Sequence, residues 1–511
     1  MNAKSILGGC VGSLIAIAGA QGADLPVKAQ PVQYVKICSL YGVGFYYIPG
    51  TDMCIKVGGY VRSQAEWGSS NGIPAGTNSI PLTGPNTIVN GLFNRASNNF
   101  NFSGRAMISV DARNESEYGT IRGYLRIGAQ TFSNSETSTF VADRAFIQFA
   151  GFTAGRAVSF FDIFTTTEAF SYTDSRTSGD TYNYGQFLFA YTAGLGNGVS
   201  ATISAEAPRR VGVIDGAGGG FSVNGVTITD TAGFDMPDIV GNLRIDQNWG
   251  YLGVSGAVHK VAGGYYNGTL SPIQAHPDDR FGWAAGVGGL INLPWGDTVG
   301  ASFVGTRGAV GYATKAGNWQ IVNGSTVGVG WVADGIFDNI LNGGPNQLPI
   351  QLTNAWSANA GYEHFWNTRW RTSLYGGYTR VWYDQTAKDI AAEHLPTPPT
   401  APGVACGQPV EGAVWPPIAV NHGEGNSCSP NFSFWQVGSR TQWNVTRDFY
   451  MGVDVTYTHL NTAYKGVAVS PVTNIYFGNT AMDDQHVLSG IFRMQYNFSA
   501  GLEGPNVVFG R

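Results

Sequence analysis

Apolar and polar residues alternate at every second position along several segments of the chain, many of them ten or more residues long. In residues 54–67, for example, Lys56 and Arg62 fall on one parity, whereas Val57 and Val61 fall on the other. A period of two is that of a β-strand, and a tilted strand crosses a bilayer in about 9–11 residues. The pattern therefore predicts membrane-crossing strands with one face toward water and the other toward lipid.

Turn signals between these segments divide the chain into sixteen predicted strands. They span 54–67, 101–113, 118–131, 141–151, 153–158, 184–194, 197–207, 238–247, 250–259, 280–291, 296–305, 355–365, 369–379, 432–443, 448–458 and 486–498. The connections alternate strictly between short turns and long loops, and the long loops lie near 68–100, 132–140, 159–183, 208–237, 260–279, 306–354, 380–431 and 459–485. This alternation is typical of outer-membrane barrels. The sequence therefore predicts an all-β fold, a 16-stranded antiparallel transmembrane β-barrel with long extracellular loops, short periplasmic turns and room for an aqueous channel.

The N-terminus has the features of a secretory signal peptide. Lys4 precedes an uncharged, mostly apolar run to Ala18, and small residues at Ala20 and Gly22 suit cleavage. A lipoprotein site at Cys10 is the alternative, but most of the apolar run follows this cysteine. We therefore expect an exported chain with a signal peptide at 1–22, an N-terminal periplasmic-side segment at 23–53, the barrel at 54–498 and a C-terminal tail at 499–511.

Composition favours a membrane barrel over a soluble protein. The chain has 72 glycines, 13% aromatic residues and only 12% charged residues, about half the charged share of a soluble domain. A secreted β-sandwich would also show short alternating strands, but it does not explain the alternating loop lengths. Beyond the signal peptide, no run of about 18 apolar residues predicts a transmembrane helix. The net charge of −5 gives no reason to expect a nucleic-acid partner.

Four cysteines outside the signal peptide form two local pairs, Cys38 with Cys54 and Cys406 with Cys428. In an exported chain, an even and locally paired set predicts disulfides. A metal site built from all four thiolates is the alternative, but the pairs are far apart and lack the short spacing of zinc ligands. We therefore expect no bound metal and no cofactor.

Several motifs resemble the alphaproteobacterial porin family. They are Ala23–Ala29, Tyr34–Cys38, Gly44–Thr51, Gly59–Arg62, Gly119–Arg122, Gly151–Arg156 and Ser159–Asp162, together with the terminal strand. The resemblance implies a trimeric general porin in the outer membrane of a Gram-negative bacterium, in contact with outer-membrane lipid and lipopolysaccharide, that passes small hydrophilic solutes and ions. It also implies that the third long loop folds into the lumen and sets the constriction. The tail after Phe498 departs from the family, whose members commonly stop at an aromatic residue.

If the loop at 159–183 enters the pore, it brings the carboxylates of Asp162, Glu168, Asp174 and Asp180. Arginines assigned to the polar parity of the first five strands form the facing wall: Arg62, Arg105, Arg122, Arg126, Arg144 and Arg156. Opposed charges across a narrow aperture create a transverse field that orients dipolar solutes and sets ion selectivity. In the alternative, these arginines pair with strand carboxylates such as Asp111 and Glu66 and only line the wall.

Enzymatic motifs lack the structural context that their chemistry needs. The one G-x-S-x-G match, Gly68–Gly72, opens a predicted loop with no helix after it, and the seven histidines show no metal-ligand spacing. We therefore expect that the chain is not an enzyme. A solute-selective sugar or peptide channel and a surface adhesin or receptor remain as alternatives, although residues 23–53 are too few for the plug of an energised importer.

Overall fold

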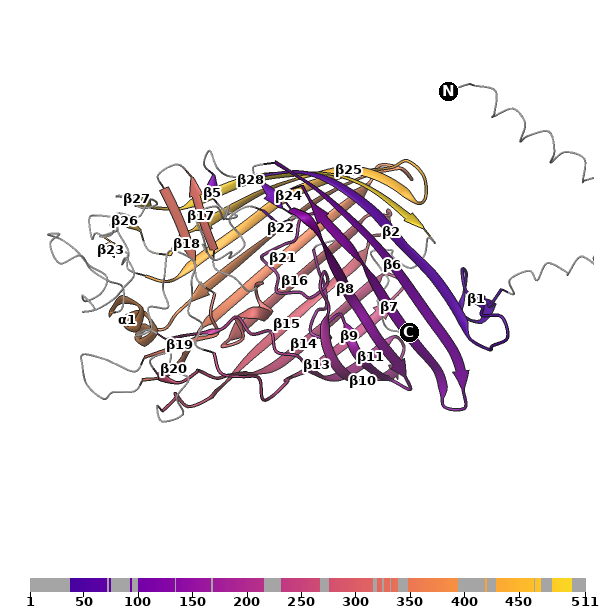
Figure 1. Ribbon diagram of the computed structural model, residues 1–511, viewed down its shortest axis with the longest axis horizontal. Coiled ribbons are helices and arrows are strands. Elements are labelled where there is room, and N and C mark those ends of the chain that lie inside the picture. The colour runs from indigo at the N-terminus through magenta and orange to yellow at the C-terminus, as the bar shows by residue number, and fades with distance from the viewer. Residues whose placement is uncertain are drawn as a thin grey trace, which may run out of the picture.

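The computed structural model is a closed barrel of tilted β-strands (Figure 1). It describes residues 37–70, 73–74, 92–93, 100–133, 135–166, 169–215, 231–266, 275–315, 319–323, 326–330, 332–338, 348–393, 419–420, 429–463, 465–469 and 480–498. Sixteen strands follow one another around the wall, each antiparallel to its neighbours, and the last pairs with the first. They are β2 (Cys54–Trp67), β6 (Phe100–Ser116), β7 (Gly119–Phe132), β8 (Ser135–Phe149), β9 (Phe152–Ala157), β10 (Gln186–Gly196), β11 (Val199–Glu206), β13 (Asp238–Gln247), β14 (Gly250–Val261), β15 (Arg280–Asn292), β16 (Thr298–Arg307), β21 (Asn354–Phe365), β22 (Trp370–Trp382), β24 (Phe432–Asn444), β25 (Phe449–Asn461) and β28 (Gln485–Phe498).

The predicted strands are confirmed, and so is the predicted fold class. β2 and β13 have the predicted bounds, and the other strand ends lie within a few residues of the prediction. β8 differs most, because it begins at Ser135 instead of residue 141. The alternation of polarity was sufficient to predict the strands, because each strand lies between lipid and the polar interior along its whole length.

The two faces of the wall have the polarity that the alternation predicts. On β2, Val57 and Val61 are 50% and 54% exposed on the outside, whereas Lys56 and Glu66 are buried on the inside. The barrel therefore has an apolar outer surface suited to lipid and a polar interior. None of the helices in the described part of the chain is long and apolar enough to span a membrane.

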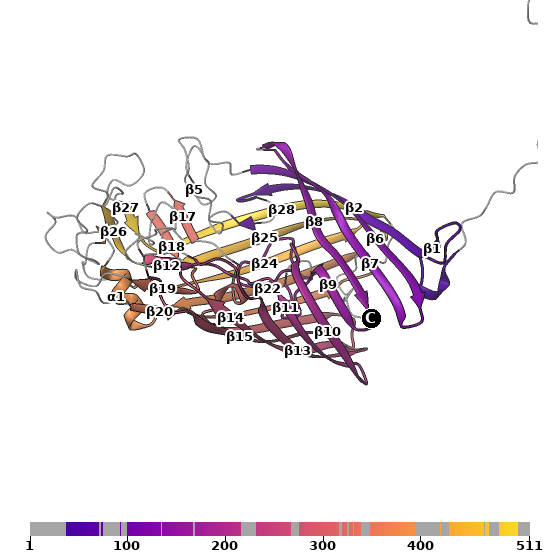
Figure 2. The same ribbon diagram turned by 60° about the horizontal axis from the view of Figure 1, so that its bottom comes forward.

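Most elements that are not part of the wall gather at its two ends (Figure 2). At the end of the short turns, a 3₁₀ helix, η1 (Ser39–Tyr41), and β1 (Tyr46–Tyr47) precede β2. The long loops supply a second 3₁₀ helix, η3 (Val310–Tyr312), and α1 (Gln385–Glu393). They also supply three small sheets. The first pairs β3 (Ser69–Ser70) with β4 (Ile73–Pro74), and the second consists of β12 (Val213–Asp215), β19 (Gly335–Asp338) and β20 (Leu348–Leu352). The third consists of β5 (Leu92–Phe93), β17 (Trp319–Asn323), β18 (Thr326–Gly330), β23 (Ala419–Val420), β26 (Gly466–Val469) and β27 (Thr480–Met482).

A disulfide joins Cys38 to Cys54, as predicted, with a Cα–Cα distance of 6.0 Å. Both cysteines are buried against Phe45. The bond ties the segment before the barrel to the first residue of β2. The predicted pair of Cys406 and Cys428 lies outside the described residues, as do the predicted signal peptide and the C-terminal tail.

Candidate constriction site

The described residues between β9 and β10, 158–166 and 169–185, cross the interior of the barrel and are termed the inward loop. Two strands on the opposite wall hold its backbone. Asp454 of β25 accepts a hydrogen bond from the Tyr172 amide at 2.5 Å, and the Asn359 amide group of β21 donates to the Thr177 carbonyl at 2.9 Å. The loop therefore spans the lumen instead of extending away from the barrel.

Glycines on the lumen side of the far wall make room for aromatic side chains of the inward loop. A Cβ atom added at Gly361 would lie 2.3 Å from the ring of Phe170, far inside van der Waals contact. An added Cβ atom would also lie 2.3 Å from Phe164 at Gly300 and 2.3 Å from Tyr172 at Gly452. Larger residues at these positions would push the loop away from the wall.

A small pocket, termed the opening, lies between the inward loop and the wall formed by β2, β6, β7 and β28. Arg62, Arg105 and Arg493 line its wall side, and Asp174 and Tyr184 lie on its loop side. Three guanidinium groups thus face one carboxylate. Arg493 was missed by the sequence prediction, although it falls on the polar parity of the terminal strand, because only closure of the barrel brings β28 beside β2.

A β-bulge adds a carboxylate to the basic wall. The register between β7 and β8 shifts after Arg126, so that Asp143 and Arg144 are consecutive buried residues. Asp143 binds Arg105 Nη2 at 3.0 Å and Arg126 Nε at 2.7 Å. A bulge inserts one extra residue and breaks the strand alternation, so a prediction from parity does not identify Asp143.

The remaining wall arginines on the lumen side occupy different places. Arg122 binds Asp111 through Nη2 at 2.9 Å, which agrees with the alternative prediction that the wall arginines pair with strand carboxylates. Arg144 is 1% exposed and donates through Nη2 to the Tyr182 carbonyl of the inward loop. Arg144 therefore holds the base of the loop, while Arg62 and Arg105 line the opening.

The prediction for Arg156 is wrong, because this residue lies on the outer face. It pairs across the sheet with Ala145 and Phe187, which are both exposed outside the barrel. Its guanidinium lies over the Phe187 ring at 5.4 Å, and its Nε donates to the Tyr184 carbonyl at 2.7 Å. β9 has six residues, and its inward positions include Gly155, which has no side chain. The polarity pattern was therefore too short to show which residues of β9 face the lumen.

Two predicted carboxylates of the inward loop are bound by cations from other loops. Asp162 lies 2.8 Å from Arg209 Nη2, which follows β11. Asp174 forms an ion pair with Lys315, which follows β16. The sequence prediction missed both cations, because residues distant in the chain meet only in the folded barrel. Glu168 lies outside the described residues.

Asp180 is buried within the loop region and does not line the opening. Burial raises the pKa of its carboxyl, and the nearby carboxylates of Asp162 and Asp174 raise it further, while Lys315 opposes the shift. Asp180 is therefore less readily ionised than an exposed aspartate. Among the described carboxylates of the loop, Asp174 is the one at the opening.

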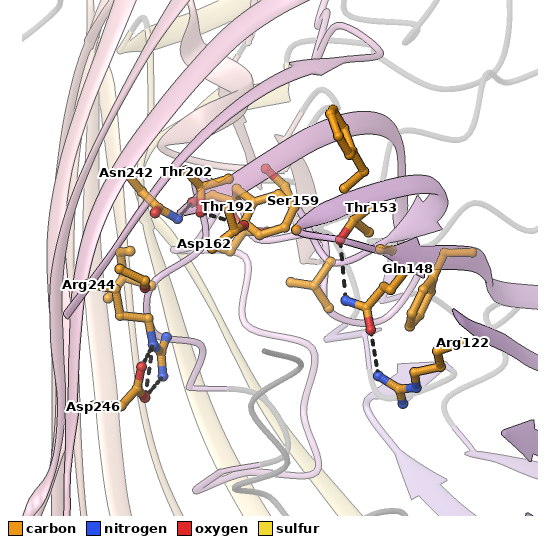
Figure 3. Close-up of a pocket in the computed structure, with 18 of the residues that line it drawn as sticks. Arg122, Gln148, Thr153, Ser159, Asp162, Thr192, Thr202, Asn242, Arg244 and Asp246 are labelled. Atoms are coloured by element: carbon orange, nitrogen blue, oxygen red, sulfur yellow. Dashed lines mark hydrogen bonds and ion pairs between the residues drawn. The ribbon is translucent and has the colours of Figure 1, made fainter. Parts of the chain in front are cut away.

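A chamber of about 510 Å³ lies on the short-turn side of the inward loop (Figure 3). Neutral hydrogen-bonding side chains from four neighbouring strands line it: Thr153, Thr192, Thr202 and Asn242. The hydroxyl groups of Thr192 and Thr202 lie 2.9 Å apart. Charged groups also line the chamber, namely Arg122, Asp162 and the Arg244–Asp246 pair. The chamber therefore offers a polar surface to a solute.

The described residues contain no group of three or more histidine, cysteine, aspartate or glutamate side chains placed to hold a metal ion. The charged residues at the opening are arranged in ion pairs and hydrogen bonds with one another and with the loop backbone. This arrangement can orient and select solutes by charge.

A closed transmembrane barrel with a loop across its lumen defines an outer-membrane channel of the porin class. The family model described as "Porin subfamily" matches residues 24–491. The chain belongs to this family and is an outer-membrane porin.

Relatives and a solved structure agree with this assignment. Porin Omp2b of Brucella neotomae is 29% identical over 342 residues, which cover 64% of this chain and 80% of the relative. Porin Omp2b of Brucella suis biovar 1 (strain 1330) is 29% identical over 307 residues, covering 57% and 71%. The outer membrane channel DcaP of Acinetobacter baumannii superposes with a TM-score of 0.55 at 11% identity, covering 88% of this chain and 99% of that chain. This structure shares the fold.

Proposed function

We propose that the channel is a passive, water-filled pore through which small hydrophilic solutes and ions diffuse down their gradients. The opening beside the inward loop carries this proposal, because fixed charges line both of its sides: Arg62, Arg105 and Arg493 on the wall and Asp174 on the loop. Charges held across a narrow aperture produce a transverse field that favours ions and dipolar solutes over apolar ones.

The chamber beyond the opening suits the same function. A solute that has passed Arg105 and Asp174 meets the hydroxyl and amide groups of Thr153, Thr192 and Asn242 (Figure 3). Such groups replace part of the hydration shell of a polar solute. Because the inward loop is bonded to the opposite wall, we expect the side chains at the opening to set the size of the aperture.

The proposal also covers the export of the chain, its oligomeric state and the membrane that surrounds the barrel. Residues 1–22 act as a signal peptide, and the mature barrel forms a homotrimer in contact with outer-membrane lipid and lipopolysaccharide. The barrel has no enzymatic activity and no nucleic-acid partner. The membership of the porin family and the apolar outer face, on which Phe189 is 74% exposed, support this assignment.

Reconstitution of the purified, unheated protein in a planar bilayer tests the proposed pore. We expect ohmic conductance that increases in steps of three channel units, one unit for each pore of a trimer. We expect that sugars do not block this conductance. The absence of conductance would reject the pore, and single steps would reject the trimer.

A solute-selective channel is the second candidate, and the chamber favours it. Thr153, Thr192, Thr202 and Asn242 form a row of neutral hydrogen-bonding groups across four strands, which could bind a polyhydroxylated solute. Saturable block of the ion current by a sugar or a peptide would support this candidate over the general pore.

A further inference from the structure

A second loop enters the barrel and packs on the inward loop. After β16 ends at Arg307, the chain forms η3 and continues to Lys315, and residues 309–314 are fully buried. Tyr312 packs against the Phe161 ring at a centroid distance of 4.5 Å, and its hydroxyl donates to Asp238 of β13 at 2.7 Å. Residues 308–315, termed the second loop, are therefore anchored to the wall and to the inward loop.

Close backbone contact joins the two loops. A Cβ atom added at Gly179 of the inward loop would lie 2.3 Å from the Gly311 carbonyl oxygen, so only glycine fits at position 179. The Thr314 hydroxyl donates to the Arg176 carbonyl at 2.7 Å. These contacts fix the position of the next residue, Lys315.

Lys315 meets the inward loop at its charged edge. Its ammonium group forms an ion pair with Asp174, and the two side chains are 9% and 4% exposed. It also lies 5.8 Å from the centre of the Tyr184 ring. Asp174 and Tyr184 both line the opening, so the second loop delivers a cation to the boundary of the aperture.

The Lys315 side chain carries a positive charge in this position. Burial alone would lower the pKa of its ammonium group, but the carboxylates of Asp174 and Asp180 raise the pKa above its ordinary value. The charge of Asp174, the one described carboxylate of the inward loop at the opening, is thereby compensated.

Cations outnumber carboxylates at the opening, and Lys315 adds to their excess. Arg62, Arg105 and Arg493 line the wall side, and Asp143, behind this wall, is shared between Arg105 and Arg126. The buried Glu66 nearby accepts hydrogen bonds from Gln64 and Ser103. The described charges at the aperture therefore sum to a net positive charge. The positive electrostatic potential of this charge raises the local concentration of anions.

We propose that Lys315 is a selectivity-determining residue of the pore, which neutralises Asp174 and makes the channel prefer small anionic solutes, such as carboxylates and phosphates, over cations. This inference rests on the proposed pore function and adds its solute class. One unit charge at about 4 Å in water is worth about 1 kcal/mol, which is about fivefold in relative permeability, and salt screening reduces the effect to about two- to fivefold.

Reversal potentials in a potassium chloride gradient across a planar bilayer test the proposal. We expect the wild-type protein to pass chloride more readily than potassium, and Lys315→Met to lower the chloride-to-potassium permeability ratio about two- to fivefold. The Lys315→Met, Asp174→Asn double variant removes both charges and should return toward the wild-type ratio. Lys465→Met is the matched control, because Lys465 also pairs with aspartates, Asp483 and Asp484, but in a more exposed loop contact.

Several outcomes would overturn the proposal. They are cation preference of the wild-type channel, an unchanged ratio in conducting Lys315→Met, or an equal shift in Lys465→Met. If Lys315→Met does not fold, Asp174→Asn decides: the proposal requires a higher anion preference, and an unchanged or lower preference would reject it. A wild-type protein without conductance would reject the pore itself, which distinguishes failure of the proposed function from failure of this inference.

Discussion

Asp143 shows how one side chain changes the charge of the basic wall. Its carboxylate is 1% exposed and lies between Arg105 and Arg126, within 3.0 Å of both. Two guanidinium groups that would repel each other are thus held together by a shared counter-ion. The number of arginines on the wall therefore overstates its charge.

Asp143→Asn should keep the shape of the side chain but remove this counter-ion. We expect the free energy of unfolding to fall by about 1.5–3 kcal/mol, the usual contribution of hydrogen bonds to a charged group, and the channel to become more anion-selective. Urea unfolding followed by tryptophan fluorescence and reversal potentials would measure the two effects. Asp246→Asn serves as the control for the unfolding measurement, because the Asp246 side chain is 37% exposed where it pairs with Arg244 and exposed pairs contribute little to stability.

Asp297 lies in the short turn between β15 and β16 and stabilises this turn in a pH-dependent way. Its carboxylate accepts hydrogen bonds from the Tyr362 hydroxyl at 2.6 Å, from His364 Nδ1 at 3.0 Å and from the Phe365 amide at 3.1 Å. These bonds hold the pKa of Asp297 well below its ordinary value of 3.8. Because the folded chain then binds this proton less readily than the unfolded chain, the stabilisation is present above pH 3.8 and is lost as the pH falls below it.

Asp297→Asn should therefore lower the melting temperature at neutral pH. We expect the difference from the wild type to be constant above about pH 5 and to shrink below about pH 4, where Asp297 of the unfolded chain begins to bind a proton while the folded chain still keeps it ionised. Thermal unfolding followed by circular dichroism between pH 8 and pH 3 would test this. A difference that is the same at every pH would show that the carboxylate charge is not involved.

Among the elements, the inward loop depends on the shape of the strands opposite to it. Phe164, Phe170 and Tyr172 project from the loop onto Gly300, Gly361 and Gly452. These strands lack side chains where the loop rests, so its aromatic rings pack directly against their backbone. The position of the loop is thus encoded in the far wall as well as in the loop.

Gly361→Ala should displace the inward loop and change the single-channel conductance, because the new Cβ would lie 2.3 Å from the Phe170 ring. Gly305→Ala, on β16, makes the same chemical change where the nearest atom is 3.9 Å away, an ordinary contact. We expect this control to keep the wild-type conductance. Equal conductance of both variants would mean that the loop does not depend on the fit at Gly361.

Closure of the barrel is the property that belongs to the whole molecule. β28 pairs with β2 from Gly59 opposite Phe498 to Trp67 opposite Gly490. The contact joins the two ends of the barrel sequence and satisfies the backbone groups that would otherwise be exposed to lipid. It also brings Arg493 to the opening.

Deletion of residues 499–511 should leave the barrel folded, because the pairing that closes it ends at Phe498. Deletion of residues 490–511 removes every register pair between β28 and β2, and we expect no closed barrel. Migration of heated and unheated samples in detergent gels distinguishes folded from unfolded barrels. Loss of folding in the shorter deletion would show that the tail takes part in assembly.

The sequence by itself determined the sixteen strands, the faces of nearly all the segments used to predict the wall, and the Cys38–Cys54 disulfide. These features are local: a strand in lipid must alternate at every second residue, and these cysteines are sixteen residues apart. Parity failed where a strand is short, as at Arg156, or bulged, as at Asp143. The tertiary structure alone decided that Lys315, Arg209 and Arg493 join the charges predicted from the loop and the first strands. Their contacts depend on the closure of the barrel and on two loops meeting inside it, and no periodicity along the chain records such distant pairs.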